Sequence, residues 1–318
     1  MERQRKTPRR AKVSWKRTAA LILAAVCVIG SLAITVTGTW KQVYGFFGLT
    51  ELGDEAESAP FSLHVLDVGK ADALLVCCGD SRMLVDCGRS PDGDAVALYL
   101  QKRGISHLDY AICTHPDSDH VGGYGTLLQK VSVNSFFAPP LDENLTKDNE
   151  VYKSLLEVLD EKQVLRKTMR SGDTFSLGQA FVQVLWPQEA MDSTNDSSLV
   201  LRITYGDTRF LLMGDAGEKV EAQLLSSGED LRADVLKVGH HGSKTASTDA
   251  FLEAVSPQYG VISVGEDRNQ LPKDETLRRL EKHQIITCRT DLDGDVLFLS
   301  DGKTITAKTQ YDAGALAG

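Results

Sequence analysis

Short apolar runs bounded by Gly, Asp and Asn fill most of residues 61–308, and segments with helical spacing lie between them. Such runs predict strands over 61–67, 72–78, 81–86, 108–113, 179–186, 197–205, 208–214, 233–239, 259–264 and 294–299. Apolar residues that recur at three- and four-residue spacing predict helices near 93–103, 121–130, 149–162, 217–227, 247–255 and 274–284. Early strands form hairpin-like sets and later ones alternate with helices, which favours two packed sheets with helices outside.

The amino terminus follows a different pattern. Residues 1–17 carry eight Lys or Arg against one Glu, and residues 18–37 contain no charged residue. A run of that length, at about 1.5 Å rise per residue, spans a hydrocarbon core of about 30 Å. We therefore predict a basic cytoplasmic stub (1–17), a transmembrane signal-anchor helix (18–37), a linker (38–60), a single domain (61–308) and a frayed tail (309–318).

The positive-inside rule keeps the basic stub in the cytoplasm, so the domain is expected outside the cell membrane, attached by a single pass. A cleaved secretory signal also begins with basic residues and is the alternative. Its apolar region is usually shorter, about 7–15 residues, and no convincing A-x-A-type cleavage site follows here. No particular protein partner is indicated by the sequence.

Charge and cysteine content narrow the function classes. After residue 17 the chain has 27 basic against 43 acidic residues, a balance of −16. A field of that sign repels polyanions, although a local basic patch can override it. The six cysteines form no C-x-x-C or zinc-finger spacing, so buried free thiols are predicted, with one disulfide as the alternative.

Candidate metal ligands cluster in Thr114–Gly123, directly after the predicted strand 108–113. Four of them fall within six residues: His115, Asp117, Asp119 and His120. Because open α/β sheets place their chemistry at the carboxyl ends of strands, a tight turn here can fold all four inward. Gly122 and Gly123 then permit close backbone approach before the next helix. Taken alone, the run could also be a polar turn.

Two further predicted strands end in ligand-type residues. Strand 208–214 is followed by Asp215, and strand 233–239 by His240 and His241. Each has a simpler explanation, since Asp after a strand often caps a helix and paired histidines can occupy a polar loop. The joint occurrence of three such strand ends favours one shared metal site.

The order of these motifs resembles that of the metallo-β-lactamase-fold hydrolases, and more narrowly the hydrolase domain at the end of ComEC-type DNA-uptake proteins. The similarity covers about residues 61–308 and lies in Leu66–Gly69, Leu84–Gly88, Thr114–Gly123, Asn195–Val200, Leu211–Asp215, Leu236–Ser243, Ser263–Gly265 and Arg289–Asp291. The resemblance implies an α/β (α+β) fold, a four-layer αββα sandwich with a dinuclear metal site at one edge.

The resemblance also implies which residues hold the two divalent ions. His115 and Asp117 would hold the first, Asp119 and His120 the second, and Asp215 would bridge them. The set is richer in oxygen donors than a histidine-dominated zinc site, which shifts the preference toward Mn²⁺, with Zn²⁺ as the alternative.

Other residues are assigned around these ligands. His241 would complete the second site and His240 would face the substrate as an acid or phosphate contact, although the reverse assignment stays open. Asp119 and His240 would then take part in catalysis. Asp67 and Asp86, both at strand ends, would orient ligand imidazoles through hydrogen bonds.

The sequence departs from the superfamily pattern at the first site. Asp117 stands where a second histidine is usual, and no histidine lies between His120 and His240 to complete the set. Asn195 or Asp196 is the candidate to fill that gap; a weakened first site is the alternative. In Asn269–Pro272 the histidine that uptake-type relatives carry in this loop is also missing.

Three lysines could add positive charge near the site or be ordinary solvated or structural residues: Lys70, Lys237 and Lys244.

Two metals about 3.5–4 Å apart would generate a bridging hydroxide at neutral pH and stabilise charge at the attacked centre. The sequence therefore predicts a membrane-anchored, extracytoplasmic phosphodiesterase or nuclease-like hydrolase, with a phosphodiester as substrate and DNA among the candidates. The ligand set disfavours β-lactam hydrolysis. The alternatives are a phosphoesterase acting on a cell-wall or small-molecule ester such as phosphorylcholine, and a non-catalytic anchored binding domain.

Overall fold

The computed structural model describes residues 59–311 except residue 267, so the predicted stub and span and nearly all of the linker lie outside the described residues. Within the described ranges no helix is long and apolar enough to cross a membrane. The first strand begins at Phe61. The last strand includes Thr309, which pairs with Val296, so this residue belongs to the sheet and not to the predicted tail.

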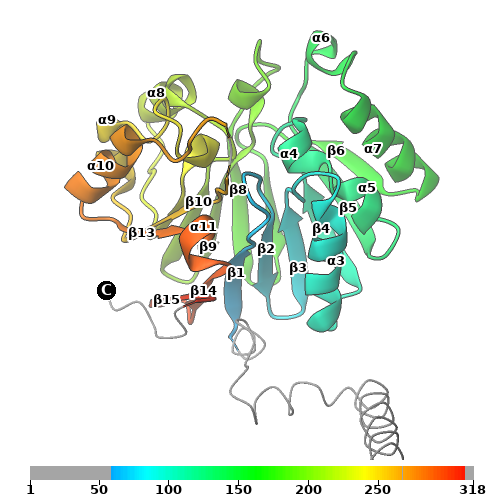
Figure 1. Cartoon of the computed structure of the whole chain (residues 1–318), viewed down its shortest axis with the longest axis horizontal. Coiled ribbons are helices and arrows are strands. Elements are labelled where there is room, and N and C mark those ends of the chain that lie inside the picture. The colour runs from blue at the N-terminus through cyan, green and yellow to red at the C-terminus, as the bar shows by residue number, and fades with distance from the viewer. Residues whose placement is uncertain (1–58, 267, 312–318) are drawn as a thin grey trace, which may run out of the picture. The chain divides into compact units, whose positions relative to one another are not determined.

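Two sheets pack against each other at the centre of the domain (Figure 1). The first has the order β15-β14-β1-β2-β3-β4-β5-β6 and the second β13-β12-β11-β10-β9-β8-β7. The first contains β1 (Phe61–Val65), β2 (Leu74–Cys78), β3 (Ser81–Val85), β4 (His107–Ile112), β5 (Ser132–Ala138), β6 (Leu165–Thr168), β14 (Val296–Ser300) and β15 (Ile305–Thr309). The second contains β7 (Thr174–Leu177), β8 (Ala180–Trp186), β9 (Val200–Tyr205), β10 (Thr208–Leu212), β11 (Val235–Lys237), β12 (Tyr259–Ile262) and β13 (Ile286–Arg289).

Helices cover the outer faces of both sheets. They are α3 (Asp92–Lys102), α4 (Ser118–Val121), α5 (Tyr124–Leu127), α6 (Glu143–Thr146), α7 (Glu150–Glu161), α8 (Glu218–Ser226), α9 (Asp249–Val255), α10 (Asp274–Lys282) and α11 (Thr290–Asp293). In Figure 1, α3, α5 and α7 lie on the side of the first sheet, and α8, α9 and α10 on the side of the second. One apolar cluster fills the space between the sheets and two more lie under the helices, which gives the four layers of the predicted αββα sandwich.

Parallel strands position the site. Strands β3 to β6 run parallel to one another, and so do β10 to β13. The loops after β3, β4, β10 and β11 therefore leave their sheets at carboxyl ends, where α/β proteins carry their chemistry. A backbone hydrogen bond of 2.8 Å from Leu199 N to Thr114 O joins the segment before β9 to the one after β4.

Five strands escaped prediction from the hydrophobic pattern: β5, β6, β7, β13 and β15. Strand β6 lies at a sheet edge with all four residues exposed, so it shows no apolar alternation. The predicted helix 121–130 is also wrong in detail, because Gly122 and Gly123 separate α4 from α5. A Cβ atom on Gly123 would lie 2.0 Å from the carbonyl oxygen of Cys87, which explains why a glycine is needed there. All five cysteines in the described ranges are free.

Candidate metal centre

The three ligand-bearing strand ends meet in one place. His115 and Asp117 follow β4, and His120 lies within α4. His240 and His241 follow β11. Asp215 follows β10, and a hydrogen bond of 3.0 Å from its amide to Ser198 Oγ fixes its backbone.

Several polar atoms in this cluster are buried and have no hydrogen-bond partner among the described residues. They are His115 Nε2, His120 Nε2, His241 Nε2 and Asp215 Oδ1. Leaving one such group unsatisfied costs about 1–3 kcal/mol, so four of them facing one point favour a bound ligand there. The donors that face one another are imidazole nitrogens and carboxylate oxygens, which suit divalent metal ions.

The two oxygens of Asp215 divide the donors into two sets. Asp215 Oδ1 lies 3.4 Å from His120 Nε2 and 3.4 Å from His241 Nε2. Asp119 Oδ2, in turn, lies 3.9 Å from His241 Nε2. Ligand atoms about 2.0–2.2 Å from a tetrahedral ion are separated by roughly 3.4 Å, so these four residues fit one ion. The structure thus brings together the residues that the sequence analysis assigned to the second site.

Asp215 Oδ2 faces the other set. It lies 3.9 Å from His115 Nε2 and 3.8 Å from His240 Nε2. Asp117 Oδ2 lies 3.6 Å from His115 Nε2. His240 Nε2 therefore faces the same carboxylate oxygen as His115 Nε2.

Residues 66–266 match the metallo-β-lactamase superfamily. The chain belongs to this superfamily. It is 30% identical over 262 residues to ComE operon protein 3 of Bacillus subtilis (strain 168), covering 76% of this chain and 33% of that protein. It is 29% identical over 238 residues to Competence protein ComA of Neisseria gonorrhoeae, covering 74% of this chain and 31% of that protein. The chain spans about a third of the length of these curated relatives.

A solved structure shows the same fold. CmlA, a diiron β-hydroxylase from Streptomyces venezuelae, matches 76% of this chain and 54% of its own chain with a TM-score of 0.54 and 12% sequence identity. At that identity the likeness concerns the fold alone. Metallo-β-lactamase domains bind divalent metals. The groups of side chains in this chain that could hold an ion overlap at His120: one contains His115 and Asp215, and another contains Asp119 and His241.

Hydrogen bonds orient the imidazoles of this superfamily member. His120 Nδ1 donates to Asp86 Oδ2 at 2.7 Å. His115 Nδ1 lies 3.1 Å from Thr114 Oγ1, which donates to Asp86 Oδ2 at 2.6 Å. His241 Nδ1 donates to the carbonyl of Ser263 at 2.8 Å. Each Nε2 is thereby left to face the cluster, as in other metal-binding histidines.

The structure does not bring Asp67 to these imidazoles. Asp67 is exposed, and its carboxylate accepts a hydrogen bond from Gly69 N at 3.2 Å. Asp72, which the sequence analysis missed, lies nearer: Oδ1 is 3.7 Å from His241 Nδ1 and Oδ2 is 3.0 Å from Lys237 Nζ. Its position before β2 gave no signal, because ligand-type residues were sought after strands.

The remaining candidates are spread around the cluster. Asn195 Nδ2 lies 3.5 Å from His240 Nε2, whereas the Asp196 carboxylate pairs with Lys219 at 3.6 Å. Lys244 is exposed, with its carbonyl accepting a bond from Arg279. Asn195 is therefore the one of these candidates that touches the first donor set.

Two consecutive histidines adopt left-handed backbone conformations. His240 has φ 47° and His241 has φ 49°. Such conformations cost of order 1–3 kcal/mol for residues other than glycine and tend to occur at functional sites. Here they turn one imidazole toward each oxygen of Asp215.

Electrostatics keep the Asp215 carboxylate anionic. Burial alone would raise the pKa of Asp215, but His241 and His120 outweigh it and hold that pKa well below the ordinary value. Burial would lower the pKa of His120, but the carboxylates of Asp215 and Asp86 raise it well above the ordinary value. Burial lowers the pKa of His115 to about 3, so this imidazole is neutral and ready to bind a metal at neutral pH.

The division of the histidines gives a direct prediction. His240→Ala and His241→Ala should each reduce bound metal from two equivalents to about one, because each removes a donor from a different set. Metal content by mass spectrometry and the spin coupling of a Mn²⁺ pair by EPR would measure this. If His240→Ala kept two coupled ions and lost only turnover, His240 would be a substrate contact and not a ligand.

Proposed function

We propose that this chain is a metal-dependent phosphodiesterase that cleaves single-stranded nucleic acid. The observation that carries the proposal is the pair of donor sets sharing Asp215, since two adjacent ions suit in-line displacement at a phosphodiester. Bound there, the ions would supply Lewis acidity and a nucleophile derived from water. The protein's own part is to fix the donors, through Asp86 on one side and the Ser263 carbonyl on the other.

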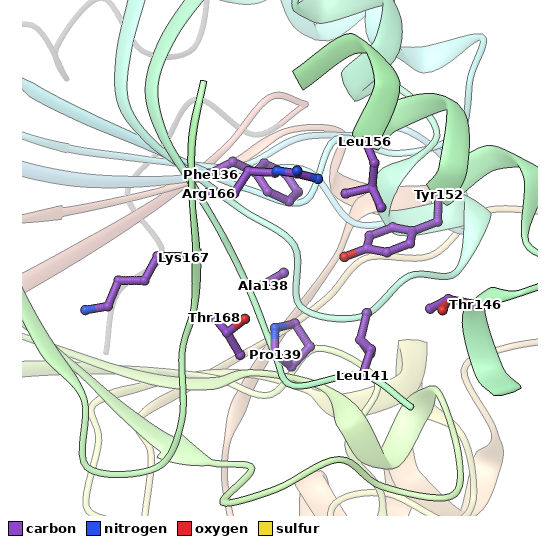
Figure 2. A pocket seen from close by; sticks show the side chains of 10 residues that line it. All are labelled: Phe136, Ala138, Pro139, Leu141, Thr146, Tyr152, Leu156, Arg166, Lys167 and Thr168. Carbon is purple, nitrogen blue, oxygen red and sulfur yellow. The ribbon is translucent and has the colours of Figure 1, made fainter. Parts of the chain in front are cut away.

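A cavity between β5, β6 and α7 offers room for a substrate larger than a small ester. It has a volume of about 500 Å³ and lies at the carboxyl ends of β5 and β6, where Ala138 and Thr168 line it (Figure 2). Tyr152 directs its hydroxyl toward this group of residues (Figure 2). One turn before it, Asn149 donates a hydrogen bond of 2.8 Å to the carbonyl of Pro116, which lies between two candidate ligands.

Positive charge gathers on the same side of the domain. Residues 162–170 include four basic and no acidic residues, in a part of the chain that is otherwise acidic. Arg166 and Lys167 line the cavity; Arg166 pairs with Asp160 at 2.8 Å, and Lys167 lies 5.9 Å from the Phe137 ring centroid. A basic strip beside aromatic residues is the usual composition of a path for single strands. A phosphorylcholine headgroup would not require a strip of this length.

The reaction can be tested with three substrates: bis-p-nitrophenyl phosphate, single-stranded DNA and p-nitrophenyl phosphorylcholine, each with Mn²⁺ or Zn²⁺. We expect turnover of the first two and little of the third. Preference for the choline ester would favour the small-molecule phosphoesterase. No turnover of any of them by protein with two bound metals would favour a non-catalytic binding domain.

The basic strip has its own prediction. The double variant Lys167→Ala, Arg170→Ala should bind single-stranded DNA more weakly than the wild type. The slope of log K against log[salt] should become shallower by about 1.4, because two phosphate contacts are lost. Hydrolysis of bis-p-nitrophenyl phosphate should stay unchanged. The matched control is Arg278→Ala, Lys282→Ala on α10, which removes the same charge from the other flank. Equal salt dependence in the two double variants would exclude the strip as a DNA path.

We also propose that the domain acts outside the membrane, held by the predicted span over 18–37. The support is the uncharged run behind a basic stub in the sequence. Protease added to intact cells should remove the domain. Protection of the domain in intact cells would contradict this placement.

A further inference from the structure

Lys70 belongs to a loop that is held by contacts with three neighbouring loops: the metal loop (Thr114–Gly123), the loop after β3 and the loop after β12. The amide of Asp72 donates a hydrogen bond of 3.1 Å to the carbonyl of Asp119, and Gly88 N donates one of 2.7 Å to the carbonyl of Asp72. Arg89 Nη2 donates a bond of 2.6 Å to the carbonyl of Lys70. On the far side, Gly69 is so close to Gly265 that a Cβ on Gly265 would lie 2.6 Å from its Cα. The loop cannot shift without breaking these contacts.

This anchoring directs the Lys70 ammonium into the cluster. Nζ lies 2.5 Å from Asp119 Oδ2, the same oxygen that faces His241. The Lys70 and Asp119 side chains keep 15% and 16% of their surface exposed, whereas the imidazoles of His120 and His241 are fully buried. Asp117 and His240 are more exposed still, at 37% and 30%, so the cluster opens to solvent on their side. Lys70 stands at the partly exposed edge of the cluster beside Asp119, within reach of a substrate bound at the donors.

The charges of the proposed reaction call for a cation at this point. A hydroxide nucleophile and a phosphodiester each bring one negative charge, while the carboxylates of Asp117, Asp119 and Asp215 already offset most of the charge of two divalent ions. A fixed donor that meets charge as it develops is among the most effective catalytic devices. Lys237 cannot serve, because it is buried and paired with Asp72.

We propose that Lys70 binds the non-bridging oxygens of the substrate phosphate, and that Arg89 is a positioning residue that holds the Lys70 loop. This inference rests on the proposed phosphodiesterase function and assigns one residue to substrate recognition. The competing role is purely internal: Lys70 would offset the charge of Asp119 and take no part in substrate binding.

The test compares Lys70→Met and Lys70→Arg with Lys282→Met, an exposed lysine on α10, in the full chain loaded with two metals. Calorimetry with inorganic phosphate should show at least about tenfold weaker binding for Lys70→Met, and near wild-type binding for Lys70→Arg and the control. The kcat for bis-p-nitrophenyl phosphate should fall about 100-fold in Lys70→Met, as when one oxyanion donor is removed. Metal content should remain at two equivalents.

Two results would overturn the inference. One is wild-type phosphate affinity in Lys70→Met. The other is loss of metal from Lys70→Met with unchanged phosphate affinity in the molecules that stay loaded, which would assign Lys70 to Asp119 alone. Phosphate titration does not require turnover, so it decides the role of Lys70 even if the wild-type protein hydrolyses no phosphodiester. If the wild type hydrolyses the phosphodiester but Lys70→Met binds phosphate as tightly as the wild type, the role of Lys70 is wrong and the proposed phosphodiesterase function stands.

Discussion

Asp215→Asn is expected to leave the protein with less than one bound metal equivalent and to lower phosphodiester turnover by roughly 10⁴-fold or more. Asp215 is the residue that both donor sets share, with Oδ1 facing His120 and His241 and Oδ2 facing His115 and His240. An amide of the same size keeps one acceptor oxygen and loses the negative charge. Metal analysis together with the rate on bis-p-nitrophenyl phosphate would measure both effects.

The matched control for this variant is Asp94→Asn, a change of the same chemistry on the exposed surface of α3. It should alter neither metal content nor rate. Retention of two equivalents by Asp215→Asn would mean that the ions are not bridged by this residue, and the division of the cluster into two sets would be wrong.

Lys237→Met is expected to lower the free energy of unfolding by about 3–5 kcal/mol, the largest stability effect anticipated here. Lys237 and Asp72 are both 1% exposed and their charged groups lie 3.0 Å apart. Loss of the lysine leaves a buried carboxylate without its counter-ion. Urea unfolding of the metal-free protein at neutral pH would measure the loss.

The double variant Asp72→Asn, Lys237→Met serves as the control for this pair. It should recover part of the lost stability, because replacing both partners leaves no unpaired charge. Burial alone would raise the pKa of Asp72, but Lys237 and His241 outweigh it and lower that pKa. The pair therefore stabilises the fold above the ordinary carboxyl pKa, and this contribution is lost as pH falls through the folded value. If Lys237→Met lowered the free energy of unfolding by less than about 1 kcal/mol, the Lys237–Asp72 pair would not be important for stability.

Much of the site could be anticipated because its ligands follow strong apolar runs. Strands β10 and β11 are mostly buried and β4 is buried over its last two residues, so the carboxyl ends of these strands, and the residues after them, are readily located in sequence. Asp86 was found by the same rule, as it follows β3 directly. The rule failed for Asp67 because that carboxylate bonds within its own turn.

The relations that sequence could not supply are those set by distant contacts. The place of Asp72 depends on a loop held between Gly265 and Asp119, which are about 146 residues apart in the chain. The separate directions of His240 and His241 depend on two left-handed backbone conformations, which residue spacing does not reveal. Edge strands such as β6 were missed because their exposed side chains carry no pattern of burial.

The proposed reaction depends on two ions, one on either side of Asp215, that together hydrolyse a phosphodiester. The most direct measurement is the rate on bis-p-nitrophenyl phosphate as the metal-free full chain is titrated with Mn²⁺ or Zn²⁺. The rate should stay low up to one equivalent, rise steeply between one and two, and level off at two. Full activity at one metal equivalent, or no activity with two ions bound, would contradict a two-ion reaction.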